Sequence, residues 1–263
     1  MGIVNATPDS FSDGGLHLDP AAALAHARRL IAEGADILDL GAESTRPGAE
    51  PVAAETEIER LVPLIEAIRA ESGVPISVDT MKPQAARAAM AAGASIWNDV
   101  TALRHAPDSL ETAAELGCEV VLMHMQGEPR TMQAEPRYDD VVGEVGAFLI
   151  ERAEAAIAAG VARDRIWLDP GIGFGKHMIR HNLPLLAGLR RITDLGFPVL
   201  LGASRKSFIG ALDNRAPADR RLGGSIAAAL AGAAAGVAAV RVHDVFETVQ
   251  ALKVRAAIEG AAG

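Results

Sequence analysis

The sequence predicts an α/β protein that folds as one (β/α)8 TIM barrel. Eight apolar runs of strand length alternate with Ala-rich stretches of helical spacing, and no linker or change in composition divides the 263 residues. Apolar residues make up 49% of the chain, enough for a large core, and aromatic residues only 3%, so that core must be aliphatic. A doubly wound open sheet is the alternative architecture, because counting strands does not prove that the sheet closes.

The expected elements follow from the apolar runs and from Gly and Pro signals between them. Strands are expected at 2–6, 36–40, 75–78, 95–100, 119–123, 166–168, 199–202 and 238–242. Helices are expected at 20–33, 54–71, 83–92, 108–116, 141–159, 183–195, 221–235 and 245–259. Asp19 caps the first helix before Pro20, and four glycines end helices: Gly34, Gly93, Gly117 and Gly160. We expect one domain covering residues 1–263.

Composition excludes several classes of protein. The net charge of −9 argues against nucleic acid or an acidic membrane surface as the main partner. Cys118 is the only cysteine, so there is no internal disulfide or Cys-rich metal site, and we expect it to be a small core residue. No secretory segment or membrane span is recognisable. These features predict a soluble cytoplasmic protein in which any anionic ligand is attracted by a local cluster of cations.

The stretch 199–208, V-L-L-G-A-S-R-K-S-F, is the most informative in the chain. It begins as a strand buried on both faces, turns through Gly202, and then places two cations between two hydroxyls. A buried strand that ends in such residues, with a helix soon after, is typical of a binding end for an anionic substrate. A basic loop at the surface is the simpler interpretation of this stretch alone.

Polar residues also follow the other predicted strands. They are Asn5, residues 43–46, Asp79, Asn98, His124, Asp169, residues 204–206, Arg241 and His243. Singly, each has a simpler explanation: Asp79 could cap a helix, Asp169 could form a turn before Pro170, and His124 is better explained as a packed core histidine. Because the carboxyl ends of barrel strands meet at one face, the set as a whole predicts a functional site there.

Two familiar motifs are absent. G-I-G-F-G-K at 171–176 is not a phosphate-binding P-loop, because Pro170 stands where the first glycine belongs and His177 replaces the Ser or Thr. Nor is it a dinucleotide fingerprint, because Lys176 occupies the third glycine position. The histidines show no zinc-site spacing.

Motifs along nearly the whole chain resemble the dihydropteroate synthase family of pterin-binding enzymes. They are G-I-V-N-A-T-P-D-S-F-S-D-G-G, D-I-L-D-L-G-A-E-S-T-R-P-G-A, S-V-D-T, W-N-D-V, V-L-M-H-M-Q-G-E-P-R-T-M-Q, L-D-P-G-I-G-F-G-K, G-A-S-R-K-S-F and V-R-V-H-D. The resemblance implies a (β/α)8 barrel, usually a homodimer, that acts in folate biosynthesis and is a sulfonamide target. Such an enzyme joins 7,8-dihydropterin-6-ylmethyl diphosphate to 4-aminobenzoate and releases pyrophosphate, with Mg²⁺.

The resemblance also implies roles for individual residues. Asp79, Asn98, Asp169 and Lys206 match pterin-binding positions, and Met123 and Phe174 match positions that pack on the ring. A pterin presents adjacent donors and acceptors, which carboxylate and amide groups complement. Its methylene is thought to become cationic during the reaction, and fixed carboxylates would stabilise that state. We therefore expect Asp79, Asp169 and Lys206 to be the catalytic residues.

The remaining roles concern the diphosphate and 4-aminobenzoate. Arg241 and His243, two positions apart and so on one side of a strand, are suited to the diphosphate, and Asn5 matches a Mg²⁺ ligand. The resemblance implies that segments 7–15 and 43–51 fold over the site. It places Thr45 and Arg46 near the substrates, gives Ser207 the 4-aminobenzoate carboxylate, and has Phe11 and Asp13 order that subsite.

Two departures from the family pattern stand out. Residues 177–180 are one residue longer than usual before His181 and Asn182, which affects the geometry after Phe174, and the sequence starts directly on the first strand, which affects how the barrel bottom is covered. The alternatives are a methyltetrahydrofolate methyltransferase-type barrel and a non-catalytic pterin-binding paralogue. The S-R-K-S-F and R-V-H-D motifs favour the synthase, because a methyltransferase has no use for diphosphate-binding cations.

Overall fold

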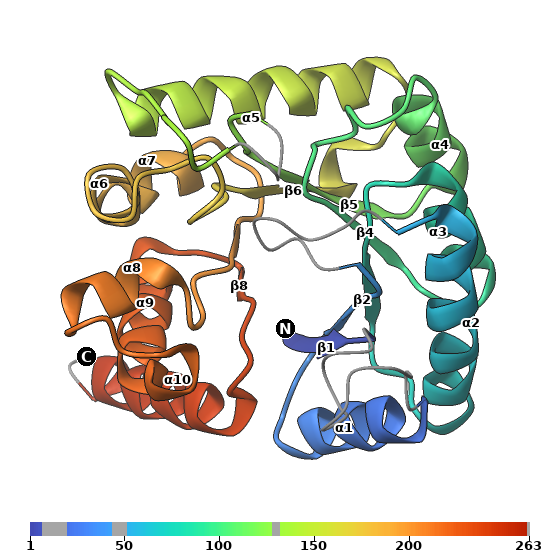
Figure 1. Ribbon diagram of the computed structural model, residues 1–263, viewed down its shortest axis with the longest axis horizontal. Coiled ribbons are helices and arrows are strands. Elements are labelled where there is room, and N and C mark those ends of the chain that lie inside the picture. Colours follow the sequence, from blue (N-terminus) through green and yellow to red (C-terminus); the bar gives the residue numbers. More distant parts are fainter. Residues whose placement is uncertain (7–19, 44–51, 128–131, 262–263) are drawn as a thin grey trace.

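The computed structural model describes residues 1–6, 20–43, 52–127 and 132–261, which form a ring of parallel strands surrounded by helices (Figure 1). The strands are β1 (Gly2–Asn5), β2 (Leu38–Gly41), β3 (Ile76–Asp79), β4 (Ile96–Asp99), β5 (Glu119–Met123), β6 (Ile166–Asp169), β7 (Leu200–Leu201) and β8 (Ala239–Val240). Each lies within about two residues of its predicted position, because each apolar run is buried between the ring interior and the helices.

The ring closes through two short seams. Strands β1 to β6 pair in chain order, and β7 pairs with β8. A parallel bridge from Leu168 to Val199 joins β6 to the start of β7, and a second from Gly2 to Val242 joins β1 to the segment after β8. At the second seam the Ile3 amide donates to the Val242 carbonyl over 3.1 Å. The barrel is therefore confirmed over the open sheet.

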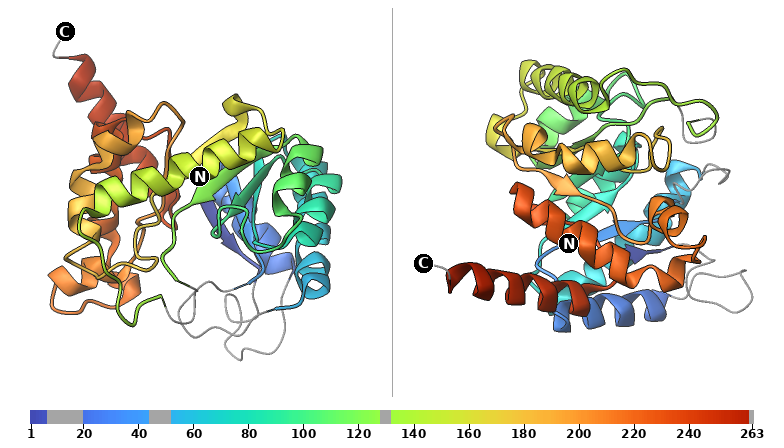
Figure 2. Two further views of the ribbon diagram at one scale, coloured as in Figure 1. Left: turned by 90° about the horizontal axis from the view of Figure 1, so that it is seen from above. Right: turned by 90° about the vertical axis from the view of Figure 1, so that its left-hand side faces the viewer.

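The helices lie outside the ring (Figures 1 and 2). They are α1 (Pro20–Ala32), α2 (Ala54–Glu71), α3 (Pro83–Ala91), α4 (Ser109–Leu116), α5 (Val141–Ala158), α6 (Asn182–Ala187), α7 (Leu189–Thr193), α8 (Ser207–Leu212), α9 (Leu222–Ala235) and α10 (Val245–Gly260), with 3-10 turns η2 (Arg163–Arg165) and η3 (Ala218–Arg220). All four predicted helix-ending glycines have positive φ, as expected. Asp19, the predicted cap, lies outside the described residues.

One helix prediction was wrong, and one short helix was missing from the expected helices. The expected helix 183–195 is two short helices that meet at Gly188, where a Cβ would lie 2.7 Å from a methyl carbon of Val142 on α5. Glycine at this position thus permits close packing at the break between the helices. Helix α8 was not predicted at all, because its six residues are too few to show helical periodicity.

Side chains alternate between the inside of the ring and the helix layer, and this alternation builds two cores. The larger core lies between strands and helices and includes Cys118, which is buried as expected. A smaller cluster inside the ring contains Ile96, Val121 and Leu200, with Trp167 packed against it. It fills the ring below the strand ends, so the polar residues above it line the mouth of the barrel. Within the described ranges, no helix is long and apolar enough to cross a membrane.

Candidate active site

The carboxyl ends of the strands bring the predicted polar residues to one level. Asn5 pairs in register with Gly41 on the next strand. Gly41 in turn pairs with Asp79, and Asp79 pairs with Asn98. Gly41 contributes no side chain to this layer, and the nearest atom to a Cβ built there would be the Asp79 Cβ, at 3.5 Å. The strand ends therefore place hydrogen-bond donors and acceptors beside Gly41, a position that has no side chain.

A second glycine opens the opposite side of the mouth. A Cβ at Gly202 would lie 3.7 Å from Asp169 Oδ2, 3.9 Å from Lys206 Nζ and 4.0 Å from Arg241 Cβ. Three predicted site residues, one at the end of β6, one after β7 and one after β8, thus surround one point. Gly202 was predicted to be a turn residue, and its further role is to leave room among these charged groups.

Arg241 holds two carboxylates together. Its Nε donates to Asp39 Oδ2 over 2.5 Å and its Nη2 donates to Asp79 Oδ2 over 2.8 Å. Burial alone would lower the pKa of Arg241, but Asp39 and Asp79 outweigh burial and raise that pKa above its usual range. The Asn98 amide lies 3.4 Å from both oxygens of Asp39. The two predicted pterin-binding residues Asp79 and Asn98 are therefore linked through Arg241 and Asp39.

Asp39 was missed by the sequence analysis. It lies inside the apolar run of β2, its side chain is fully buried, and its partner Arg241 is 202 positions away in the chain. A carboxylate within a buried strand requires a counter-charge, and this was the signal that could have identified it. Asp39 keeps Arg241 at the centre of the site.

Burial strongly affects the protonation of Asp79. It raises the pKa of Asp79 to about 7, with Arg241 opposing the shift and Asp39, Glu57 and Asp99 adding to it. The carboxyl does not cap α3, since Lys82 occupies the N-cap position of that helix. Asp79 is thus a buried group that titrates near neutral pH, a property common at functional sites.

Asp169 acts in a turn and also faces the site. Its Oδ1 accepts the Gly171 amide over 2.7 Å, as the turn interpretation requires, while Oδ2 faces the point above Gly202. Burial raises the pKa of Asp169, and Lys206 opposes the shift. Burial likewise lowers the pKa of Lys206 to about 8, with Asp169 opposing. Asp169, which is buried, and Lys206, which is half-buried, are therefore neighbouring groups of opposite charge at the mouth.

An apolar wall stands beside this pair. Met123, Met125 and Met132 form a buried cluster with Val100, and the Phe174 ring packs against it. Lys206 Nζ lies 4.7 Å from the centre of the Phe174 ring and donates to the Ile172 carbonyl. The Phe174 ring therefore lies next to Lys206, and Met123 belongs to the apolar cluster on which this ring packs.

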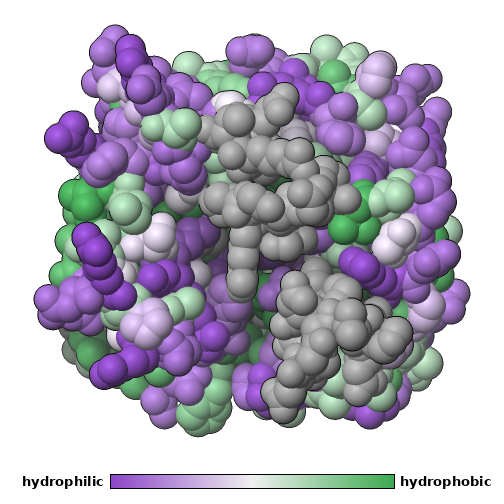
Figure 3. Space-filling model, in the orientation of Figure 1, coloured by the Kyte–Doolittle hydropathy of each residue, from purple (hydrophilic) through white to green (hydrophobic). Residues whose placement is uncertain are grey.

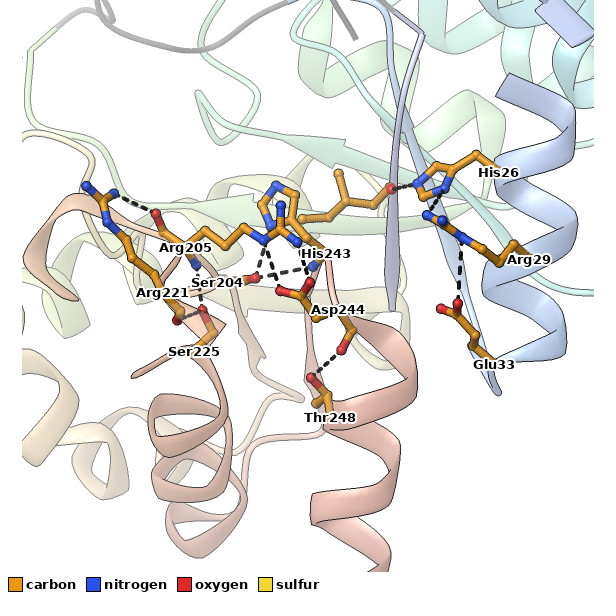
Figure 4. Close-up of polar contacts among 11 residues, drawn as sticks. His26, Arg29, Glu33, Ser204, Arg205, Arg221, Ser225, His243, Asp244 and Thr248 are labelled. Atoms are coloured by element: carbon orange, nitrogen blue, oxygen red, sulfur yellow. Dashed lines mark hydrogen bonds and ion pairs between the residues drawn. The ribbon is translucent and has the colours of Figure 1, made fainter. Parts of the chain in front are cut away.

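A cavity of about 620 Å³ adjoins Asn5 and His243. Its lining includes Arg205 from the β7–α8 connection and His26 and Arg29 from α1, which face each other across the view in Figure 4. Arg205 Nε donates to Asp244 Oδ2 over 2.9 Å. Cationic and amide groups thus line this side of the mouth, and of the residues predicted for the diphosphate end Asn5 and His243 are among them.

Supporting contacts hold this side in place. Ser204 Oγ lies 3.0 Å from His243 Nδ1 and accepts the His243 amide over 3.2 Å. Arg241 and His243 both follow the two residues of β8, and they make different contacts: Arg241 meets carboxylates and His243 meets a hydroxyl. The face of the molecule seen in Figure 3 is largely hydrophilic.

Other predicted residues are placed less fully. Ser207 is exposed at the first position of α8. Thr45, Arg46, Phe11 and Asp13 lie outside the described residues. In the described part of the chain, no group of three or more His, Cys, Asp or Glu side chains could hold a metal ion.

The segment 177–180, predicted to be one residue longer than is usual in the family, lies in a turn. Residues 177–181 fold back so that Asn182 Oδ1 accepts the Gly173 amide over 2.8 Å. The Asn182 amide group also donates to the His177 and Met178 carbonyls, each over 3.3 Å. The loop that carries Phe174 is therefore tied to the start of α6 by hydrogen bonds of Asn182.

Known proteins are similar to this chain in sequence and in structure. Residues 1–243 match the family described as pterin binding enzyme. Dihydropteroate synthase of Escherichia coli (strain K12) is 50% identical over 254 residues, covering 97% of this chain and 89% of that protein. The structure of Xanthomonas albilineans dihydropteroate synthase with 4-aminobenzoic acid has a TM-score of 0.92 and 52% identity, covering 98% of this chain and 92% of that one. The same enzyme in complex with 7,8-dihydropteroate has a TM-score of 0.88 and 50% identity, with coverage of 98% and 92%.

Proposed function

The chain belongs to the dihydropteroate synthase family of pterin-binding enzymes, and from this premise we infer the reaction that its barrel mouth performs. It joins 7,8-dihydropterin-6-ylmethyl diphosphate to 4-aminobenzoate and gives 7,8-dihydropteroate and pyrophosphate, a step of folate biosynthesis. The observation that carries this conclusion is the convergence of Asp79, Asn98, Asp169 and Lys206 around the space left by Gly41 and Gly202.

The reaction exchanges one bond at the pterin methylene. The carbon–oxygen bond to the diphosphate breaks, the amine nitrogen bonds to the carbon, and one amine proton is released. We propose that Asp79, Asn98 and Asp169 bind the donor and acceptor edge of the pterin and that Lys206 contacts the ring. The same fixed carboxylates favour positive charge on the methylene, so they stabilise the transition state more than the ground state.

The diphosphate would lie toward the Asn5 and His243 side. We propose that Arg241 and His243 bind it and that Asn5 supplies one ligand of a Mg²⁺ ion. A single amide oxygen at the half-buried end of β1 suits a hard cation held mainly by substrate phosphates. When bound, the ion would neutralise charge on the departing pyrophosphate. Titration of pyrophosphate with and without Mg²⁺, on wild type and Asn5→Ala, tests this assignment.

Pyrophosphate release tests the proposed reaction. The purified protein is mixed with the pterin diphosphate, with 4-aminobenzoate, and with both. We expect stoichiometric pyrophosphate and dihydropteroate only with both substrates. Binding of the pterin without product would instead favour a non-catalytic paralogue, and tight binding of methyltetrahydrofolate without pyrophosphate release would favour the methyltransferase type.

The pH profile of kcat/KM for the pterin diphosphate should be bell-shaped and narrow. Ionised Asp79 accepts hydrogen bonds, and because its pKa is about 7, activity should fall tenfold per pH unit below that value. Lys206, with a pKa of about 8, should lose its charge and cause a fall at higher pH. Lys206→Arg should flatten only the alkaline limb.

Binding of a pterin that lacks the diphosphate serves as the control for this pH profile, because such a ligand removes phosphate titration from the measurement. A flat profile between pH 6 and 9 for both ligands would contradict the assignment of Asp79 and Lys206 to pterin binding.

We further propose a cytoplasmic homodimer. Helix α10 projects from the body of the molecule in both views of Figure 2. Phe246, Val254 and Ile258 on this helix are each more than half exposed, and such apolar surface is typical of subunit contacts. Sedimentation equilibrium of the wild type and Ile258→Glu tests the dimer.

A further inference from the structure

The loop G-I-G-F-G-K surrounds the buried side-chain nitrogen of Lys176 instead of a phosphate. Burial lowers the pKa of Lys176 well below its usual range. The side chain of Lys176 is only 1% exposed. Its Nζ lies 2.9 Å from His124 Nδ1, 3.3 Å from the His124 carbonyl, 2.9 Å from the Gly171 carbonyl and 3.0 Å from the Phe174 carbonyl. All four of these partners are neutral acceptors. Lys176 therefore joins the end of β5 to both ends of the loop.

The histidine in this cluster is suited to accept a hydrogen bond. Burial lowers the pKa of His124 to about 3, and the neighbouring Lys176 lowers it further, so the imidazole is neutral. A neutral imidazole with an unprotonated Nδ1 accepts from the lysine. This contact explains why a histidine lies among methionines behind the apolar wall.

Three glycines allow the loop to close around Lys176. Gly171, Gly173 and Gly175 have φ values of 65°, 84° and 58°, in the left-handed region. A Cβ at Gly171 would lie 1.9 Å from the His124 carbonyl oxygen, and one at Gly175 would lie 2.3 Å from the Gln126 carbonyl oxygen. The loop backbone thus packs directly against the backbone of residues 124–126, and the Lys176 side chain lies inside the loop.

The groups that Lys176 holds lie beside the proposed pterin site. It binds the carbonyl of Phe174, whose ring forms part of the apolar wall under Lys206 Nζ. It also binds the carbonyl of Gly171, the neighbour of Ile172, to which Lys206 donates. Moving the loop backbone would therefore move the wall and the partner of Lys206 together.

We propose that Lys176 is a positioning residue for pterin binding, holding Phe174 and the Ile172 carbonyl where the ring and Lys206 require them. This inference rests on the proposed function. The loop has further anchors, since Tyr138 Oη donates to the Gly175 carbonyl over 2.8 Å and Asn182 accepts the Gly173 amide. The protein is therefore expected to fold without Lys176 while its pterin site is displaced.

A double-mutant cycle separates positioning from general stability. Lys176→Met keeps the length of the side chain and removes its hydrogen bonds, Phe174→Ala removes the ring, and the third variant carries both changes. We expect Lys176→Met to weaken binding of a 7,8-dihydropterin about tenfold and to add less than about twofold in the Phe174→Ala background. The KM for 4-aminobenzoate should change less than about twofold. Tyr138→Phe, which removes another hydrogen bond to the same loop, is the matched control and should leave pterin affinity near wild type.

Hydrogen exchange in the ligand-free protein provides a readout independent of the ligand. Lys176→Met should speed exchange of the amides in residues 171–176, with little change in α9. If Lys176→Met does not fold, Lys176→Gln replaces it in the same cycle. Additive effects of the two substitutions, or unchanged pterin affinity in a folded Lys176 variant, would overturn this inference alone. A wild-type protein that binds no pterin would overturn the proposed function, and this inference with it.

Discussion

Arg241→Met is expected to destabilise the fold by about 3–5 kcal/mol, the range measured when one partner of a buried ion pair is removed. Asp39 would keep a fully buried carboxylate whose remaining contact is the Asn98 amide at 3.4 Å. Urea denaturation at pH 7.5 measures the change. Arg191→Met is the matched control, since Arg191 pairs with Asp140 with both side chains more than half exposed, and it should cost less than about 1 kcal/mol.

A double substitution distinguishes the effect of the buried charge on stability from the effect of side-chain packing. Asp39→Asn combined with Arg241→Met removes both charges and should recover most of the lost stability. It should not recover turnover, because Arg241 is also proposed to bind the diphosphate. A double variant no more stable than Arg241→Met would show that packing of the arginine, and not the buried charge of Asp39, is what the fold requires.

Asp79→Asn and Asp169→Asn should each lower kcat by about 10²–10³-fold, the loss typical for a fixed electrostatic contact to a transition state. Each change removes a charge beside the developing cation and exchanges a hydrogen-bond acceptor for a donor. Steady-state kinetics of both variants measures the loss, and their melting temperatures should stay close to that of wild type.

Asp99→Asn is the control for these two variants. Asp99 also lies at the end of a strand and is fully buried, but its carboxylate accepts from the Thr101 amide and hydroxyl and from the Leu103 amide. Its replacement should lower stability and leave kcat within a few-fold. Near-wild-type kcat in both Asp79→Asn and Asp169→Asn would show that the pterin is bound elsewhere.

The features of the fold that depend on local sequence patterns could be predicted from the sequence. Each strand was recognisable as an apolar run, and once the strands form a barrel their ends must share one face, which is why Asp79, Asn98 and Asp169 could be grouped in advance. Asp169 was interpreted as either a turn or a site residue; in the structure one oxygen accepts the Gly171 amide of the turn and the other lies near Gly202.

Other features depend on partners that are distant in the chain. The role of Asp39 depends on its ion pair with Arg241. The role of Lys176 depends on its contact with His124, which lies 52 positions earlier in the chain. Neither pairing leaves a periodic signal in the sequence. Similarly, the break at Gly188 depends on how closely Val142 approaches it from α5. These are tertiary contacts, so they appear only once the barrel is built.

The central claim is that a pterin occupies the space beside Gly202. The most direct test is calorimetric titration of a 7,8-dihydropterin into wild type and Gly202→Ala. A methyl group at this position would meet its nearest neighbours at 3.7–4.0 Å, ordinary contact distances, so the empty protein should accept it. Gly73→Ala is the control, because nothing lies within 4 Å of a Cβ there. We predict that Gly202→Ala binds the pterin at least about tenfold more weakly at an unchanged melting temperature, whereas Gly73→Ala binds as wild type does. Equal affinity in wild type and Gly202→Ala would contradict the account.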